Sequence, residues 1–346
     1  MTSSFPDPRT FILETTDRVW NRKQIGELYH RAYSNVRVHG PSGRSCHGRE
    51  AWMADILSWL GAFPDVQVTC EHLIVNGEAA DAWVAEQRLL SGHHLNPSIY
   101  GLPTGRSFSI RAHLLYRVIQ GRIREVWQEV DEVGLLRQLG LDPLQVLEQL
   151  ETYYGLPCPR DGAWQPVGEA ERTRGQLPPP ALPPLPDPFA VDRFLRRCYD
   201  AIWNWRLVGE VENLYAPQAE EYGWGEPRHG VQAIRSWVLE RLNMLPDLTV
   251  SIDRTVWEGD GRRGYHVAAL WTLVGTHAGP AYWGPPSLHR LRLQGISHHY
   301  IRRHRIQKTW MSVGELGLVQ HIAPRPSAEP PPTPASQDAG PIETNP

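Results

Sequence analysis

The chain has 346 residues with a hydrophobic content of 41%, a length for which two domains are expected. Its formal net charge of −3 gives no overall basic field that would indicate a nucleic-acid partner. Four cysteines without close spacing argue against a zinc site or a disulfide framework and fit a reducing cytosol. No stretch approaches the roughly 20 apolar residues of a membrane helix, so we expect no membrane partner and a cytoplasmic protein.

The first half of the chain predicts helices followed by antiparallel strands. Apolar residues at helical spacing predict helices over Asp17–Tyr33 and Arg49–Phe63. Period-two alternation predicts strands over Val36–His39, Val66–Val75 and Ala82–Leu90. Asn76-Gly77 predicts a hairpin turn between the last two of these strands. This order gives an α+β fold in which helices cover one face of a curved sheet.

Two further strands, Phe108–Ile119 and Arg122–Val130, are predicted to form a hairpin around Gln120-Gly121, because glycine tolerates the positive φ of a tight turn. An unbroken register places Leu114 opposite Trp127 and Ile110 opposite Asp131. Since side chains alternate across a strand, one apolar face then carries Phe108, Ile110, Ala112, Leu114, Tyr116, Ile123, Trp127 and Asp131.

Asp131 is the anomaly of this face, because it is a carboxylate at the end of an apolar stripe. It has two interpretations. It can cap the helical run Glu132–Leu139 as an N-cap residue, or it can act as a general acid/base whose pKa is raised by apolar neighbours. Glu129, on the same face, is the competing carboxylate.

An ordered series of short motifs resembles one known family. The motifs are AFPD at 62–65, GHH at 92–94, GLPTGR at 101–106, YRV and GRI within 116–123, W-x-x-x-D at 127–131 and GLLRQLG at 134–140. Together they resemble the SnoaL-like polyketide cyclases of the nuclear transport factor 2-like (NTF2-like) superfamily. The resemblance covers Thr16 to Leu141 and implies a cone-shaped fold. It also implies that an aspartate at the position of Asp131 acts as acid/base in the aldol ring closure of a polyketide ester.

The second half of the chain repeats the first. Residues 84–138 align without gaps to 267–321, and 15 of the 55 aligned residues are identical. Trp127 matches Trp310, but Asp131 matches Gly314 and Glu129 matches Ser312. A repeat of this size indicates duplication of a whole domain, and the second copy is expected to be degenerate.

We therefore predict two tandem SnoaL-like domains. The first spans residues 10–154 and the second 189–323. Ten prolines lie between Gly155 and Pro188, which predicts an extended linker over 155–188. The tail, 324–346, has the same composition and is predicted to be disordered. We expect the two repeats to pair through their sheets as an intrachain pseudo-dimer, with further oligomerisation left open.

The predicted site is a pocket for a small apolar or aromatic ligand around Asp131, with Trp127 and Tyr116 as aromatic walls. Ile110, Leu114 and Glu129 share the predicted face. His39 and His94 are candidate hydrogen-bond donors to a carbonyl, and a structural role is open for each. HExxH and nucleotide-binding motifs are absent, so we expect neither a metal nor a cofactor.

The expected function is a cofactor-free polyketide or ester cyclase that uses Asp131. One alternative is a dehydratase or isomerase of the same superfamily, since one fold hosts several reactions. The other alternative is a non-catalytic protein that binds a small molecule or serves in assembly.

Overall fold

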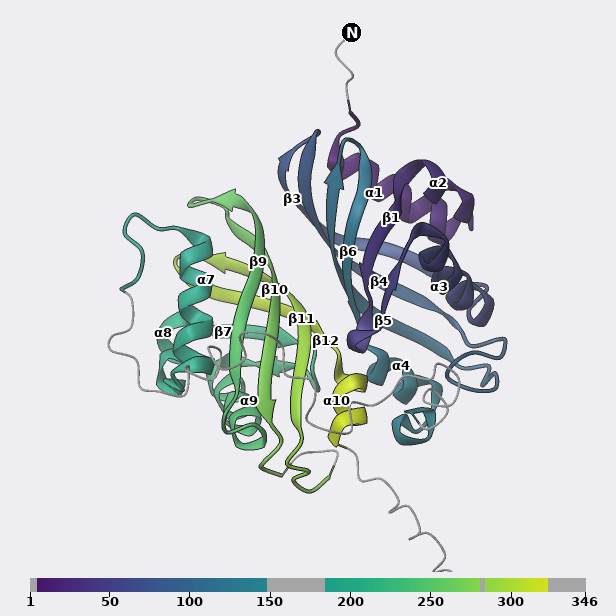
Figure 1. Cartoon of the computed structure of the whole chain (residues 1–346). Coiled ribbons are helices and arrows are strands. Elements are labelled where there is room, and N and C mark those ends of the chain that lie inside the picture. Colours follow the sequence, from purple (N-terminus) through teal and green to yellow (C-terminus); the bar gives the residue numbers. More distant parts are fainter. Residues whose placement is uncertain (1–4, 148–183, 281–283, 323–346) are drawn as a thin grey trace, which may run out of the picture.

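The computed structural model describes residues 5–147, 184–280 and 284–322, which form two similar α+β domains (Figure 1). The first domain consists of α1 (Pro8–Thr16), η1 (Asp17–Asn21), η2 (Ile25–Glu27), α2 (Leu28–Arg31), β1 (Ala32–His39), η3 (Pro41–Gly43), β2 (Ser45–His47), α3 (Arg49–Ala62), β3 (Gln67–Glu78), β4 (Asp81–His93), β5 (Ser107–Ile119), β6 (Arg122–Val130) and α4 (Glu132–Leu139). The second consists of α7 (Val191–Tyr199), η5 (Asp200–Asn204), η6 (Val208–Glu210), α8 (Val211–Leu214), β7 (Tyr215–Tyr222), β8 (Arg228–His229), α9 (Gly230–Met244), β9 (Thr249–Asp260), β10 (Gly264–Thr276), β11 (Arg290–Arg302), β12 (Arg305–Val313) and α10 (Glu315–Ile322).

Each domain is a six-stranded sheet covered on one face by helices, which confirms the predicted α+β class. The strand orders are β2-β1-β6-β5-β4-β3 and β8-β7-β12-β11-β10-β9. Only β1 with β6, and β7 with β12, run parallel within these sheets. The helices enclose one apolar core on the inner face of each sheet. We call this helix-covered side the interior face and the other side the outer face.

The first helix differs from the prediction. It begins at Pro8, because the Asp7 carboxylate accepts a hydrogen bond from Thr10 N at 2.9 Å and proline suits the first helical position. The predicted single helix to Tyr33 is interrupted by the π-helical turn η1 and by Lys23, whose φ is 58°. The helix predicted over Arg49–Phe63 is confirmed as α3.

The hairpin turn predicted at Asn76-Gly77 lies further along the chain. Glu78 pairs with Asp81, so Ala79 and Ala80 make the turn and Gly77 lies within β3. A Cβ on Gly77 would overlap Asp81 O. Glycine at this position therefore permits close strand contact.

The register predicted for the next hairpin is wrong beyond its first pairs. Val118 pairs with Ile123, but Arg117 pairs with Glu125, so Arg124 is an extra residue in β6. This β-bulge moves every later residue of β6 to the other face of the sheet. Leu114 consequently lies opposite Gln128, and Trp127 lies opposite Leu115. The second domain has the same bulge, at Gln307.

The outer faces of the two sheets contact each other, with α1–α3 and α7–α9 on the far sides and with α4 and α10 beside each other at the domain contact (Figure 1). Their shared apolar cluster contains Ile74, Ala85, Leu115, Val256, Ala268, Leu270 and Ile296, with Trp83 and Trp127 packed against it. Polar contacts also join the domains. His113 Nδ1 lies 2.8 Å from Ser312 Oγ, and Arg9 forms an ion pair with Glu258 at 2.6 Å.

A glycine allows close packing at one point between the domains. A Cβ on Gly314 would lie 3.0 Å from Ser42 Cα and 3.7 Å from Glu129 Oε2. The position that aligns with Asp131 is therefore part of a domain contact.

In the ranges that the structure describes, no helix is long and apolar enough to cross a bilayer. The predicted linker lies outside these ranges except for residues 184–188, and the predicted tail lies wholly outside them.

We predict that Gly314→Asp weakens the domain contact. The new side chain must displace Ser42 and brings a carboxylate towards Glu129, so the free energy of unfolding should fall by about 1–3 kcal/mol, as for other overpacked sites. Urea denaturation measures this. Gly209→Asp is the matched control, because nothing lies within 4 Å of a Cβ at that glycine. Equal stability of the two variants would show that the contact is loose.

Candidate functional site

The interior of the first domain contains a buried carboxylate, Glu86 on β4. Thr16 Oγ1 donates to Glu86 Oε1 at 3.1 Å, and Tyr116 Oη donates to Glu86 Oε2 at 2.9 Å. These groups come from α1, β4 and β5, so the carboxylate links the helix to the sheet. Burial, followed by the nearby Glu86 charge, raises the pKa of Tyr116 well above its usual range.

Arg88 and Gln128 extend this polar cluster. The Arg88 guanidinium lies over the Trp20 ring at 4.9 Å, and Arg88 Nη1 is 4.0 Å from Glu86 Oε2. Arg88, Gln128, Leu114 and Tyr116 line an internal cavity of about 20 Å³. This volume is about that of one water molecule, so the interior is closed in this conformation.

Asp131 follows β6 and caps α4. Its Oδ1 accepts a hydrogen bond from Gly134 N at 2.8 Å, and its backbone N–H donates to Arg111 O at 3.2 Å. Within the described ranges, Oδ2 accepts no hydrogen bond. Burial raises the pKa of Asp131, and the bond from Gly134 opposes this effect. Both interpretations of Asp131 therefore have physical support, although it does not line the internal cavity.

Trp127 and Glu129 lie on the outer face, contrary to the predicted stripe, and His39 lies there beside Trp127. The ring of Trp127 stacks on His39 at 4.9 Å, and His39 Nε2 is 2.9 Å from Glu125 Oε1. Glu129 is buried between the domains, and burial raises its pKa well above its usual range. The bulge at Arg124 is the cause, because it reverses the faces of β6.

The remaining predicted residues lie in the core of the first domain. Ile110 and Leu114 are buried core residues on the interior face. His94 Nε2 is 3.0 Å from Ser98 Oγ, and Thr104 N donates to its Nδ1 at 3.4 Å. Both ring nitrogens of His94 thus contact its own β4–β5 loop, which favours a structural role.

The interior of the second domain has a different polar cluster. Ser297 Oγ lies 2.8 Å from His299 Nε2 and 2.9 Å from Tyr199 Oη. His299 Nδ1 lies 3.0 Å from Thr309 Oγ1. Burial lowers the pKa of His299 to about 3, so this imidazole is neutral at physiological pH. The corresponding positions of the first domain are Leu114, Tyr116, Thr16 and Val126.

Glu221 on β7 lies beside this cluster, because its backbone pairs with Thr309. It is fully buried, and among the described residues neither carboxylate oxygen has a hydrogen-bond partner. Arg228 Nη2 is 3.7 Å from Oε1. Burial raises the pKa of Glu221 to about 7. A buried carboxylate without hydrogen bonds is rare in folded proteins and marks a candidate functional group.

Sequence reasoning missed Glu86 and Glu221. The strand period offered a signal for Glu86, since it shares its parity with Val84 and Leu90 on β4. No comparable signal marked Glu221, because the run Glu220-Glu221 resembles a solvated turn. Only the sheet pairing separates the half-exposed Glu220 from its buried neighbour.

The described side chains contain no group of three or more His, Cys, Asp or Glu residues arranged to hold a metal ion. Cys46, Cys70 and Cys198 are free thiols.

Each of the two domains matches the family model for SnoaL-like polyketide cyclases, over residues 10–139 and 193–322. The chain therefore belongs to the SnoaL-like polyketide cyclase family, and its two domains are NTF2-like.

Two relatives are methyl ester cyclases. The aklanonic acid methyl ester cyclase DnrD of Streptomyces peucetius is 32% identical over 119 residues, which cover 34% of this chain and 77% of that protein. The nogalonic acid methyl ester cyclase of Streptomyces nogalater is 27% identical over 144 residues, covering 41% of this chain and 91% of that protein. Among solved structures, IdmH, a putative polyketide cyclase from Streptomyces antibioticus, is 26% identical, with a TM-score of 0.35 and coverage of 39% and 99%.

We predict that Glu221 makes stability pH-dependent. The pKa of Glu221 in the folded protein, about 7, exceeds its ordinary value of 4.5. The contribution of Glu221 to folding stability is therefore complete below pH 4.5 and is lost as the pH rises through 7. At 1.36 kcal/mol per pKa unit the loss is up to about 3 kcal/mol. Urea denaturation between pH 5 and 8.5 should show this loss in the parent protein and in the control Glu220→Gln, but not in Glu221→Gln. An identical slope in all three proteins would contradict the assignment.

Proposed function

We propose that the first domain catalyses an aldol-type ring closure of a small apolar carbonyl ester, with Asp131 as general acid/base. The observation that carries this proposal is the state of the Asp131 carboxylate. One oxygen is held by Gly134 N, the other accepts no hydrogen bond in the described ranges, and burial raises its pKa. An oriented carboxylate with a free oxygen and a raised pKa suits proton transfer near neutral pH.

The proposed step uses only groups of the chain and the substrate. Asp131 takes a proton from the carbon between two carbonyl groups, and the resulting enolate attacks a ketone carbon of the same molecule. The new C–C bond converts the ketone oxygen into an alkoxide, which then takes the proton back from Asp131. The net reaction is an isomerisation of the ester to its ring-closed aldol.

Glu86 is the competing base inside the cone, but its hydrogen bonds disfavour that role. Thr16 and Tyr116 both donate to it, which occupies both of its oxygens. We assign Glu86 to positioning Tyr116.

We further propose that the second domain serves the first as an intrachain partner. Leu115 and Trp127 belong to an outer-face cluster that residues of the second domain complete. A monomeric first domain would expose this cluster to water. Tethering keeps the partner at a high effective concentration.

Aklanonic acid methyl ester, the substrate in the name of one relative, is the first assay compound. Asp131→Asn should lower kcat by about 10²–10⁴-fold, as expected for loss of a general acid/base. Its stability should be unchanged, since asparagine caps helices as well as aspartate does. Asp131→Ala should lose the same activity and, in addition, about 1 kcal/mol of unfolding free energy.

These two variants separate catalysis from capping. Full turnover by Asp131→Asn would refute the catalytic role. Binding of the ester without turnover by the parent protein would favour the alternative of a non-catalytic binding protein.

A further inference from the structure

Four histidines from both domains gather where the outer faces of the two sheets meet. His72 on β3 and His113 on β5 belong to the first domain, and His266 on β10 and His298 on β11 belong to the second. The ring centroids of His72 and His266 are 4.3 Å apart, and those of His113 and His298 are 5.2 Å apart. His72 and His298 join the two pairs at 6.2 Å. We call these four residues the histidine cluster.

Two members of the histidine cluster are buried with ring nitrogens that have no partner. His113 is 1% exposed and His298 is 2% exposed. His113 Nδ1 contacts Ser312 Oγ, but its Nε2 and both ring nitrogens of His298 have no hydrogen-bond partner among the described residues. A buried charge is costly unless a counter-charge pairs with it. The closed contact between the domains therefore favours the neutral form of both histidines.

The charged groups beside His72 and His266 are already paired with each other. Arg9 of α1 forms an ion pair with Glu258 of β9 at 2.6 Å. Burial lowers the pKa of His72 to about 4, the neighbouring imidazole acts in the same direction, and the Glu258 charge opposes both. Burial also lowers the pKa of His266, whose ring stacks on Tyr300 at 4.9 Å. Because Arg9 holds Glu258, that carboxylate compensates only part of a charge on either ring.

His113 and His298 are the more deeply buried pair. Burial lowers the pKa of His113 to about 3, and burial together with the neighbouring imidazoles lowers that of His298 well below its ordinary value. The ionisable groups near these two rings, apart from the rest of the cluster, include Arg111, Glu71, Glu129 and His299. Arg111 pairs with Glu71 at 2.8 Å, and burial favours the neutral form of Glu129. A proton on either histidine therefore remains largely uncompensated.

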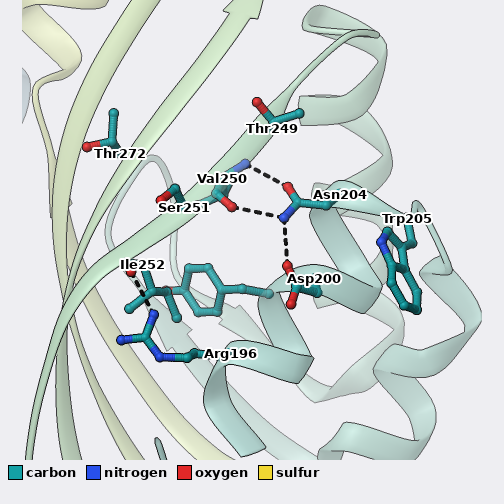
Figure 2. A pocket seen from close by; sticks show the side chains of 10 residues that line it. Arg196, Asp200, Asn204, Trp205, Thr249, Val250, Ser251, Ile252 and Thr272 are labelled. Atoms are coloured by element: carbon teal, nitrogen blue, oxygen red, sulfur yellow. Dashed lines mark hydrogen bonds between the residues drawn. The ribbon is translucent and has the colours of Figure 1, made fainter. Parts of the chain in front are cut away.

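A groove of the second domain, between the segment α7–η5 and β9, provides a contrast (Figure 2). Its volume is about 350 Å³. Asn204 Nδ2 donates to Asp200 Oδ1 and to Val250 O, both at 2.9 Å (Figure 2). Asn21 makes the same two kinds of contact in the first domain. The fold therefore explains Asn204 and Asp200, whereas it leaves the unpaired nitrogens of the histidine cluster unexplained.

The alignment of the two repeats shows that the contact does not need histidine at the buried positions. His113 aligns with Ile296, and His298 aligns with Leu115. Ile296 and Leu115 both belong to the apolar cluster between the domains. Equivalent positions of the two sheets thus carry aliphatic side chains on one side of the contact and imidazoles on the other.

The same asymmetry holds for the second histidine pair. His72 pairs with Gln87, and Arg254 pairs with Leu270, the residue that aligns with Gln87. His72 therefore corresponds to Arg254, and His266 corresponds to Trp83. The Arg254 guanidinium lies over the Trp83 ring at 4.4 Å, a favourable contact between a cation and an aromatic face. One side of the contact accommodates a permanent cation, and only the histidine side can change its charge near neutral pH.

We propose that the histidine cluster makes the contact between the two domains acid-sensitive, so that uptake of protons separates the domains while each of them stays folded. Protonated imidazoles at the distances of the cluster repel each other in a water-poor contact. Separation places the rings in water, where each imidazole is free to carry its charge. This behaviour does not depend on the reaction proposed at Asp131.

The direction of the pH effect follows from proton linkage. In the separated state each histidine titrates near its ordinary pKa of about 6.5. Its pKa is lower in the closed contact, so the closed state is fully favoured above about pH 6.5 and loses this advantage as the pH falls. Each histidine raises the ratio of separated to closed molecules by up to about tenfold per pH unit.

Two buried carboxyl groups titrate in the opposite direction. Burial raises the pKa of Glu129, so this carboxyl favours the closed contact as the pH falls. It is one group against the four histidines. Glu221 lies inside the second domain, so its titration affects unfolding of that domain and not separation of the two.

Fluorine NMR of the full-length protein labelled with 5-fluorotryptophan tests the proposal. Trp83 contacts Arg254 across the domain boundary, whereas Trp20 and Trp237 lie in the two separate cores. Between pH 7.5 and 4.5 the Trp83 signal should pass to that of a second state, and the Trp20 and Trp237 signals should stay in place. We expect the ratio of separated to closed molecules to rise at least tenfold between pH 6 and pH 5.

The variants use the residues of the other side of the contact. His298→Leu and His113→Ile should each reduce the pH dependence of the Trp83 signal, and combining them should reduce it further. His72→Gln provides the same test at a less buried position if those variants do not fold. His30→Gln is the matched control, because His30 is exposed on α2 and should leave the pH dependence unchanged.

Three results would overturn the proposal. The first is a Trp83 signal that stays in the closed state down to pH 4.5 in the parent protein. The second is a pH dependence that is the same in the parent, in the cluster variants and in His30→Gln. The third is a simultaneous change of Trp83, Trp20 and Trp237, because acid would then unfold the domains instead of separating them.

Discussion

A single extra residue in β6, and one in β12, determines which side chains of these strands face the interior and which face the other domain. The bulge at Arg124 directs Val126, Gln128 and Val130 into the first cone. It directs Trp127 and Glu129 to the outer face, where the other domain packs. Because the side-chain period of a strand is two, no gradual adjustment could achieve this exchange. The matching bulge at Gln307 gives the second sheet the same arrangement of interior and outer side chains.

The residues that join the two domains therefore lie on the outer faces, and the buried polar groups that could act chemically lie on the interior faces. The outer faces share one apolar cluster and one histidine–serine contact, so their residues are constrained by packing against each other. The interiors are free to differ. Glu86 and Arg88 supply the polar groups of the first, whereas Ser297, His299 and Glu221 supply those of the second. The second repeat has Gly314 at the position of Asp131 and carries other buried polar groups.

Much of the fold followed from local sequence patterns. The helix at Arg49, the hairpin at Gln120-Gly121 and the duplication were each predictable from periodicity, turn chemistry or internal alignment. The candidate site was less accessible. The cap at Asp131 was among the predicted alternatives, but the predicted faces of Trp127 and Glu129 were wrong, since nothing in the sequence marks Arg124 as a bulged residue. Glu221 could not be predicted, because its burial arises from pairing with Thr309.

The claim that the outer faces exist to be covered can be tested by expressing residues 1–155 alone. Sedimentation equilibrium and urea denaturation would compare this fragment with the full chain. We expect the fragment to self-associate or to be less stable, because Leu115 and its apolar neighbours lose their cover. A fragment that is monomeric and as stable as the first domain of the full chain would contradict it, and the second repeat would then need another reason for its contact with the first.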